Sequence, residues 1–212
     1  MPYKHFIFDI DGTLIDTEHT GVESLQQTIK ELMHIDMPYD EAYHYFGIPS
    51  YKVGPMLGYH DPTEFLELWE KRFQEMMYLM KTFPGSEETL KAVKAAGRQA
   101  GVVTSRSTFE FTHDPLLKAL LPYIDFSICV EDSSKHKPDP DPLFAYFRKA
   151  GDTTGVKVLP EECIYIGDMV HDYKCAHSAG CDFALADWRG RGLQGIPAEY
   201  HFTDITQVLT LL

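Results

Sequence analysis

Two carboxylates stand close together near the start of this 212-residue chain, in the segment Asp9-Ile10-Asp11-Gly12-Thr13. The run that leads into them, His5 to Ile10, is apolar and rich in aromatic and β-branched residues, which is typical of a buried strand. Side chains alternate along an extended chain, so both carboxylates face the same way, and Gly12 permits a sharp turn after them. Carboxylates are costly to desolvate, and they serve as nucleophiles, acid–base groups and metal ligands.

Three further strand-like runs end in residues that suit the same chemistry. The runs are Gln99 to Thr104, Phe126 to Val130 and Cys163 to Ile166. The residues in question are Thr104, Ser105 and Arg106 at the first, Lys137 after the second, and Asp168 and Asp172 after the third. Ligands of open parallel sheets bind at the carboxyl ends of the strands, so we expect hydroxyls, a lysine and clustered carboxylates to converge at one sheet edge.

Strand-like and helical runs alternate through most of the chain and would position these residues. Asp182 to Leu185 is a fifth strand-like run, and helical spacing occurs in Glu87 to Ala96, Pro115 to Leu121, Pro142 to Ala150 and Asp172 to Ala179. Glycines stand where helices would stop, at Gly97, Gly151 and Gly180. This alternation predicts an α/β fold, a Rossmann-like three-layer core in which helices cover both faces of a parallel sheet.

One segment, residues 17–82, interrupts the alternation. Gly21 to Met33 and Thr63 to Met80 have helical periodicity, and we find no convincing strand there. We therefore predict a core domain of residues 1–16 and 83–212 with an inserted all-helical subdomain of residues 17–82. The aromatic residues of the insertion are expected to form its core: Phe65, Trp69, Phe73 and Tyr78.

The composition excludes several classes of protein. Nineteen basic and 32 acidic residues give a formal net charge of −13, which would repel nucleic acids and anionic lipids. No apolar stretch reaches the ~20 residues that span a bilayer, and the N-terminus leads straight into a strand without a signal-peptide pattern. Cys129, Cys163, Cys175 and Cys181 lie too far apart for a zinc motif and are expected to be buried free thiols. We expect a cytoplasmic protein without nucleic-acid or membrane partners, a monomer or weak homodimer.

Four motifs in order make the sequence resemble a haloacid dehalogenase-like hydrolase across most of its length. FDIDGTLIDTE resembles the family's D-x-D-G-T, VVTSR its second motif, KHKPDP its lysine motif and IGDMVHD its G-D-x-x-x-D motif. The insertion of residues 17–82 matches the position of the family's helical cap. The branch it resembles contains phosphoglycolate phosphatases and β-phosphoglucomutases.

The resemblance implies a role for each motif residue. Asp9 would be the nucleophile that forms an aspartyl-phosphate, and Asp11 the general acid and then the base. Clustered carboxylates beside a phosphate need a cation, and oxygen ligands suit Mg²⁺. Its ligands would be the carboxylates of Asp9 and Asp168 and the backbone carbonyl of Asp11, with Asp172 supporting them. Thr104 and Lys137 would hold the phosphoryl oxygens.

Other residues are candidate substrate contacts. Ser105 and Arg106 stand where many relatives carry Asn and Lys, and Arg106 could reach either the substrate or a surface carboxylate. In the cap, Phe46-Gly47-Ile48-Pro49-Ser50-Tyr51-Lys52 resembles the segment with which relatives read the leaving group. Lys52 is then a substrate candidate, or a solvated lysine at a helix start. Trp188-Arg189-Gly190 would either border the crevice or form a plain loop.

These residues together predict a Mg²⁺-dependent phosphatase for a small phosphorylated metabolite. A phosphomutase of the β-phosphoglucomutase type uses the same nucleophile and acid and stays an alternative, as does a phosphonate hydrolase with Lys52 as a Schiff base. A catalytically silent binding module is the alternative from another class, although every charged motif residue is present. Dehalogenation is disfavoured, because it needs no carboxylate at the position of Asp11.

Overall fold

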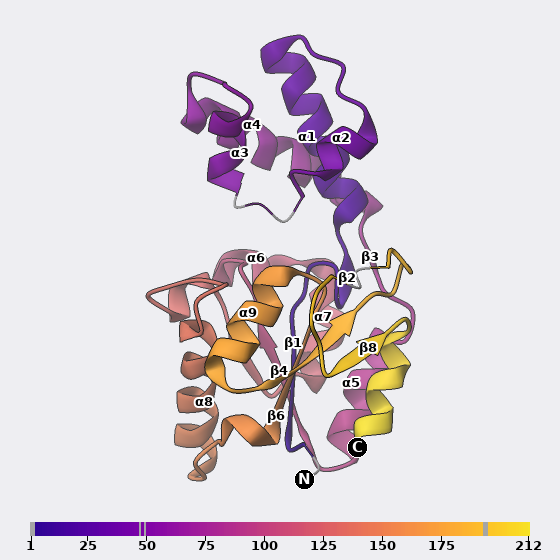
Figure 1. Ribbon diagram of the computed structural model, residues 1–212, viewed down its shortest axis with the longest axis vertical. Helices are drawn as coiled ribbons and strands as arrows, with labels where there is room; N and C mark the ends of the chain where they lie inside the picture. Colours follow the sequence, from indigo (N-terminus) through magenta and orange to yellow (C-terminus); the bar gives the residue numbers. More distant parts are fainter. Residues whose placement is uncertain (1–2, 47, 49, 193–194) are drawn as a thin grey trace. The chain divides into compact units, whose positions relative to one another are not determined.

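The computed structural model describes residues 3–46, 48, 50–192 and 195–212. By its internal contacts the chain divides into two compact units (Figure 1). The core unit comprises Met1–Ile15 and Thr82–Leu212, and the helical unit comprises Asp16–Lys81. Among the described residues, no helix combines the length and the apolar character needed to cross a bilayer.

A six-stranded parallel sheet in the order β5-β4-β1-β6-β7-β8 forms the centre of the core unit. The strands are β1 (His5–Phe8), β4 (Gln99–Val103), β5 (Phe126–Ile128), β6 (Cys163–Gly167), β7 (Asp182–Ala186) and β8 (Tyr200–Phe202). This confirms the predicted α/β fold. The chain leaves β1 toward β4 on one side and later returns to β6 on the other, so β1 lies at the switch point where ligands of such sheets bind.

Helices cover both faces of this sheet. They are α5 (Ser86–Ala95), α6 (Thr108–His113), α7 (Pro115–Leu120), α8 (Asp141–Thr154) and α9 (Val170–Ala179), with the 3₁₀ helices η2 (Leu121–Tyr123), η3 (Val130–Asp132), η4 (Pro160–Glu162) and η5 (Ile205–Leu211). The helices α8 and α9 pack in one buried cluster with Ile7, Tyr165 and Phe183 of the sheet. On the opposite side of the sheet lie α5 and η5, which contact each other (Figure 1). All four cysteines are free and buried.

Several predicted boundaries in the core unit were wrong. Gly151 does not end its helix, because α8 continues to Thr154 and stops at Gly155, which adopts the left-handed conformation at φ 70°. The other two glycines follow their helices as predicted: Gly180 caps α9 at φ 83°, and Gly97 has φ 70° just after α5. The edge strand β8 was missed, since its three residues include the exposed His201 and show no apolar run.

The helical unit has its own small core. It contains α1 (Glu18–Met33), α2 (Tyr39–Tyr43), α3 (Ser50–Met56), α4 (Pro62–Glu75) and the 3₁₀ helix η1 (Met77–Leu79). Val22, Leu25 and Ile29 of α1 pack with Phe65 of α4. The predicted helix from Thr63 to Met80 is thus two elements, and Tyr78 is 77% exposed rather than part of the core.

Two short strands join the units. β2 (Ile15–Asp16) and β3 (Lys81–Thr82) pair with each other, although no strand was predicted in this part of the chain. Each has only two residues, which is too short for a recognisable alternation of apolar and polar side chains.

Candidate active site

Asp9 extends the pairing of β1 by one residue. Its N–H donates to the carbonyl of Ile166 (2.9 Å), and the preceding Phe8 pairs with Val102 of β4 and Ile166 of β6. The carboxylate therefore emerges between the carboxyl ends of two neighbouring strands, and it is buried. The sheet thus places Asp9 at the edge where the sequence predicted the chemistry to gather.

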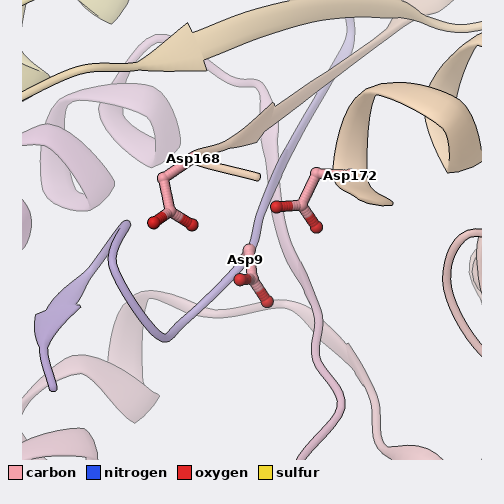
Figure 2. A group of neighbouring side chains, drawn as sticks. All are labelled: Asp9, Asp168 and Asp172. Atoms are coloured by element: carbon pink, nitrogen blue, oxygen red, sulfur yellow. The ribbon is translucent and has the colours of Figure 1, made fainter. Parts of the chain in front are cut away.

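Three carboxylates cluster at this edge, those of Asp9, Asp168 and Asp172. One oxygen of each lies within 4.8 Å of the others, and Figure 2 shows the three side chains turned toward one another. Asp168 directly follows β6, and Asp172 lies in the first turn of α9, where it accepts from the backbone N–H of Met169 (3.1 Å). Asp168 and Asp172 follow Asp9 by 159 and 163 positions in the sequence, and the parallel topology of the sheet brings them to it.

Gly12 lets Asp168 approach the loop that follows Asp9. A Cβ atom on Gly12 would stand only 2.1 Å from Asp168 Oδ2, and Gly12 also has φ +80°. Both the close approach and the left-handed backbone therefore require glycine at this position.

Lys137 places a positive charge against two of the three carboxylates, those of Asp9 and Asp172. Its Nζ donates to Asp9 Oδ1 (2.8 Å), to Asp172 Oδ1 (2.8 Å) and to the hydroxyl of Tyr165 (3.0 Å). The lysine side chain is 8% exposed. All three N–H bonds of the ammonium are used, so its position is fixed from three sides.

The buried cluster carries more negative charge than Lys137 can balance. Burial raises the pKa of Asp9 to about 7, with Lys137 lowering it and Asp172 and Asp11 raising it further. Burial, Asp172 and Asp9 together raise the pKa of Asp168 well above its usual value. Burial alone would lower the pKa of Lys137, but Asp172 and Asp9 outweigh it and raise that pKa well above its ordinary range.

These residues fit a hard divalent cation. Asp168 Oδ1 is buried without a hydrogen-bond partner in the described structure, and unsatisfied buried oxygens are rare and costly. Carboxylate oxygens with excess negative charge are the ligand set that Mg²⁺ prefers. Of the four predicted metal residues, the structure brings together the side chains of Asp9, Asp168 and Asp172. The side chain of Asp11 is directed to Arg106 instead.

Arg106 contacts two carboxylates. Its Nε and Nη2 donate to both oxygens of Asp11, with shortest distances of 3.0 and 2.7 Å, and its Nη1 donates to Asp114 (2.5 Å). Burial would lower the pKa of Arg106, but Asp11 and Asp114 raise it above its usual value. Arg106 thus pairs with carboxylates of the chain itself, and its assignment as a substrate contact stays a prediction.

Thr104 and Ser105 lie between the end of β4 and Arg106. The N–H of Thr104 donates to the carbonyl of Ile128 (3.0 Å), and its buried hydroxyl oxygen accepts from the N–H of Arg106 (3.1 Å). As an acceptor in that bond, the hydroxyl keeps its own proton to donate. Ser105 is exposed.

Lys52 lies in the other unit, in α3. It is exposed, and its Nζ lies 5.6 Å from the ring centroid of Tyr51. Gly47 and Pro49 of the predicted leaving-group segment are outside the described residues. The assignment of Lys52 as a substrate contact stays a prediction.

Three residues of this region were missed or left open. Tyr165 contacts Lys137 but reads in the sequence as one more core aromatic in an apolar strand. The signal for it is chemical, because a buried tyrosine hydroxyl needs a hydrogen-bond partner. Asp114 gave no signal beyond a helix cap before Pro115. Trp188 borders the loop after Asp9, since its Nε1–H donates to the carbonyl of Thr13 (2.8 Å).

Comparison with known proteins identifies similar chains. The sequence model of the family described as Haloacid dehalogenase-like hydrolase matches residues 6–186. The Phosphoglycolate phosphatase of Nitrosospira multiformis is 29% identical over 192 residues, covering 85% of this chain and 81% of its own. Pyrophosphatase PpaX of Bacillus velezensis is 25% identical over 193 residues, covering 91% and 87%. A crystal structure from Lactobacillus plantarum with the provisional name phosphoglycolate phosphatase has a TM-score of 0.85 at 23% identity, covering all of both chains.

Proposed function

The chain belongs to the haloacid dehalogenase-like hydrolase family, whose relatives here are phosphatases and pyrophosphatases, and we propose that it is a Mg²⁺-dependent phosphatase of a small phosphorylated metabolite. Asp9 is proposed as the nucleophile and the reaction as one that passes through an aspartyl-phosphate. The role of residues 17–82 as a cap that reads the leaving group is part of the same proposal.

The observation that carries this proposal is the group formed by the buried Asp9 and Asp172 with the half-buried Asp168 and Lys137. Asp9 Oδ1 lies 2.8 Å from Lys137 Nζ, and the three carboxylates lie within 4.8 Å of one another. A stable fold gains little from gathering three like charges, two of them buried, at the carboxyl ends of strands. A nucleophile, a phosphate-binding cation and metal ligands account for all four side chains.

The first proposed step transfers the phosphoryl group to Asp9. A carboxylate oxygen of Asp9 forms a bond to phosphorus while the bond from phosphorus to the leaving oxygen breaks. Asp11 gives its proton to that oxygen, so the product leaves as an alcohol. Lys137 and the hydroxyl of Thr104 would donate to the phosphoryl oxygens, where fixed donors stabilise the transition state.

The second proposed step returns Asp9 to its starting form. Asp11, now a carboxylate, takes a proton from water as the water oxygen bonds to phosphorus. The bond from phosphorus to Asp9 breaks, and inorganic phosphate leaves. Mg²⁺, which Asp9, Asp168 and the backbone carbonyl of Asp11 would hold with support from Asp172, would neutralise the charge that gathers on the phosphoryl oxygens.

The decisive experiment measures phosphate release by purified protein from a panel of phosphoglycolate, pyrophosphate, sugar phosphates and nucleotides. We expect turnover of at least one of them with Mg²⁺ and none with EDTA. Asp9→Asn should abolish turnover while the circular dichroism spectrum stays unchanged. Asp182→Asn is the matched control. Asp182 begins β7, at the amino ends of the strands and so at the opposite end of the sheet from the site, and it accepts a hydrogen bond from the Tyr3 hydroxyl. We expect this variant to keep full activity. Undiminished turnover by Asp9→Asn would refute the assignment of the nucleophile.

The same panel separates two of the alternatives, and a trapping experiment separates the third. A phosphomutase would convert a sugar phosphate into its isomer with little release of phosphate. A silent binding module would release none from any substrate. A phosphonate hydrolase with a Schiff base at Lys52 would be trapped covalently by borohydride in the presence of its substrate.

A further inference from the structure

We propose that Arg106 is a positioning residue, which holds the carboxylate of Asp11 in the orientation for proton transfer to the leaving group. The inference deepens the proposed function and rests on it. It concerns Arg106, one of the two residues at which the second motif departs from the pattern of many relatives.

The contact between Arg106 and Asp11 fixes an orientation as well as a distance. Nε lies 3.3 Å from Oδ1 and 3.0 Å from Oδ2, and Nη2 lies 2.7 Å from Oδ1. A planar guanidinium that meets both oxygens of a carboxylate holds its plane as well as its position.

Arg106 itself is anchored at both ends. Its N–H donates to Thr104 Oγ1 (3.1 Å), and its carbonyl accepts from Val130 N–H (2.9 Å). The far end of the side chain is held by Asp114, which is 1% exposed and also caps α7 through the N–H of Leu116 (2.7 Å). These contacts fix the position of the guanidinium, and the guanidinium in turn restricts the side chain of Asp11, which is 36% exposed.

The same contacts disfavour a direct role in binding the substrate. The Arg106 side chain is only 10% exposed, and its single positive charge already faces two carboxylates. An anionic substrate would meet a guanidinium whose charge already faces Asp11 Oδ1 at 2.7 Å and Asp114 Oδ2 at 2.5 Å. Arg106 therefore acts on the reaction through Asp11.

This role has a signature that a binding role lacks. Protonation matters for a poor leaving group, such as the alkoxide of an alkyl phosphate, and little for the stable phenolate of an aryl phosphate. The ratio kcat/KM reports the first transfer, in which the leaving group departs. A misplaced Asp11 should thus lower kcat/KM selectively for alkyl phosphates.

The experiment compares two esters, phosphoglycolate and 4-nitrophenyl phosphate. Arg106→Lys keeps the charge and loses the two-nitrogen contact, and we expect kcat/KM to fall about 10- to 100-fold for phosphoglycolate and less than about threefold for the aryl ester. Asp114→Asn, which loosens the anchor without touching Asp11, should give the same pattern in weaker form. Arg72→Lys is the matched control, because Arg72 lies between Glu31 and Glu75 in the helical unit, and it should change neither ester.

Two kinetic results would overturn the inference: equal losses for both esters, or no loss for either in folded Arg106→Lys protein. A crystal structure of that variant gives a readout independent of turnover, in which Asp11 should leave its wild-type side-chain torsion. An unmoved Asp11 would also overturn the inference. Wild-type protein that hydrolyses neither these two esters nor any other substrate of the panel would refute the proposed function, and the torsion of Asp11 would still decide whether Arg106 positions it.

Discussion

The hydroxyl of Tyr165 joins three parts of the site. It accepts from Lys137 Nζ (3.0 Å), donates to the carbonyl of Val103 (3.0 Å) and lies 3.2 Å from Asp172 Oδ1. Burial raises the pKa of this tyrosine well above its usual value, so the hydroxyl stays neutral and keeps its proton. A single oxygen atom thus ties the lysine to the end of β4.

Removing that oxygen should weaken catalysis without unfolding the protein. In Tyr165→Phe, Lys137 loses one of its three acceptors and a buried carbonyl loses its donor, so we expect kcat to fall about tenfold and the free energy of unfolding by about 1–3 kcal/mol. Tyr146→Phe is the control, because that buried hydroxyl contacts His5 (3.2 Å) and no residue of the site. It should keep wild-type kcat. Equal kcat values for the two variants would contradict a role of the Tyr165 hydroxyl in positioning Lys137.

Gly12 offers a test of the Asp168 position. Gly12→Ala and Gly97→Ala both place a side chain at positive φ, +80° and +70°, and this backbone strain by itself should lower the stability of each by about 1 kcal/mol. Only Gly12→Ala also collides with Asp168, because the space around Gly97 is open. We expect its Mg²⁺ affinity, measured by isothermal titration calorimetry, to fall at least about tenfold. An equal affinity in both variants would show that Asp168 does not bind the metal from this position.

The site residues that follow strands could be predicted from the sequence. The residues that position them, such as Tyr165 within a strand, could not. Asp9, Lys137 and Asp168 follow apolar strands, and parallel strands bring their carboxyl ends to one edge. Tyr165 sits inside such a strand, where the pattern shows only that it is buried. The pairing of Arg106 with Asp11 depends on side-chain directions after a turn, which spacing does not determine.

At the scale of elements, buried strands of four or five residues were easier to locate than the two- and three-residue strands β2, β3 and β8 or the end of α8. β4, β6 and β7 lie within one residue of their predicted bounds, because buried strands are short, continuous apolar runs. Gly151 and Gly155 look equally suited to end α8. Only the second adopts the left-handed conformation that stops a helix, and this depends on the packing of the following chain.

The loop that carries Lys137 depends on the start of α8. Asp141 accepts from the backbone N–H of Ser134 (2.8 Å), from its hydroxyl (2.9 Å) and from the N–H of Lys135 (3.2 Å). These bonds lower the pKa of Asp141, so the carboxylate is charged at neutral pH and each bond is charge-assisted. A side chain of the helix therefore fixes the loop that precedes it.

Loosening this loop should displace Lys137 without removing it. We expect Asp141→Ala to lower kcat/KM by about 3- to 30-fold, since an ångström of displacement at a reacting group can cost that much. Asp152→Ala changes an exposed aspartate of the same helix and should leave kcat/KM unchanged. Steady-state kinetics on the best substrate of the panel measure both. Similar kcat/KM values in the two variants would show that the position of this loop does not affect catalysis.

For the molecule as a whole, the acidic cluster couples folding to protons and to the metal. The pKa of Asp9 is about 7 in the folded protein against 3.8 for an ordinary aspartate, and that of Asp168 is raised as well. At pH values between 3.8 and about 7, Asp9 is largely protonated in the folded protein, whereas in the unfolded chain it has lost its proton. The stability of the metal-free protein should therefore fall as the pH rises from about 4 to about 7.

Unfolding measured in EDTA and in Mg²⁺ at pH 5 and at pH 8 tests this coupling. In EDTA, the raised pKa of Asp9 should lower the free energy of unfolding by on the order of 4 kcal/mol between pH 4 and pH 7. Asp9→Asn should remove much of this pH dependence, because the amide does not titrate. Mg²⁺ should raise the melting temperature of the wild type more at pH 8 than at pH 5, since protons compete for the same oxygens. Asp9→Asn should show a smaller gain from Mg²⁺. A wild type that melts at the same temperature with and without Mg²⁺ at pH 8 would mean that the cluster does not bind the cation, and the excess charge of the site would then need another partner.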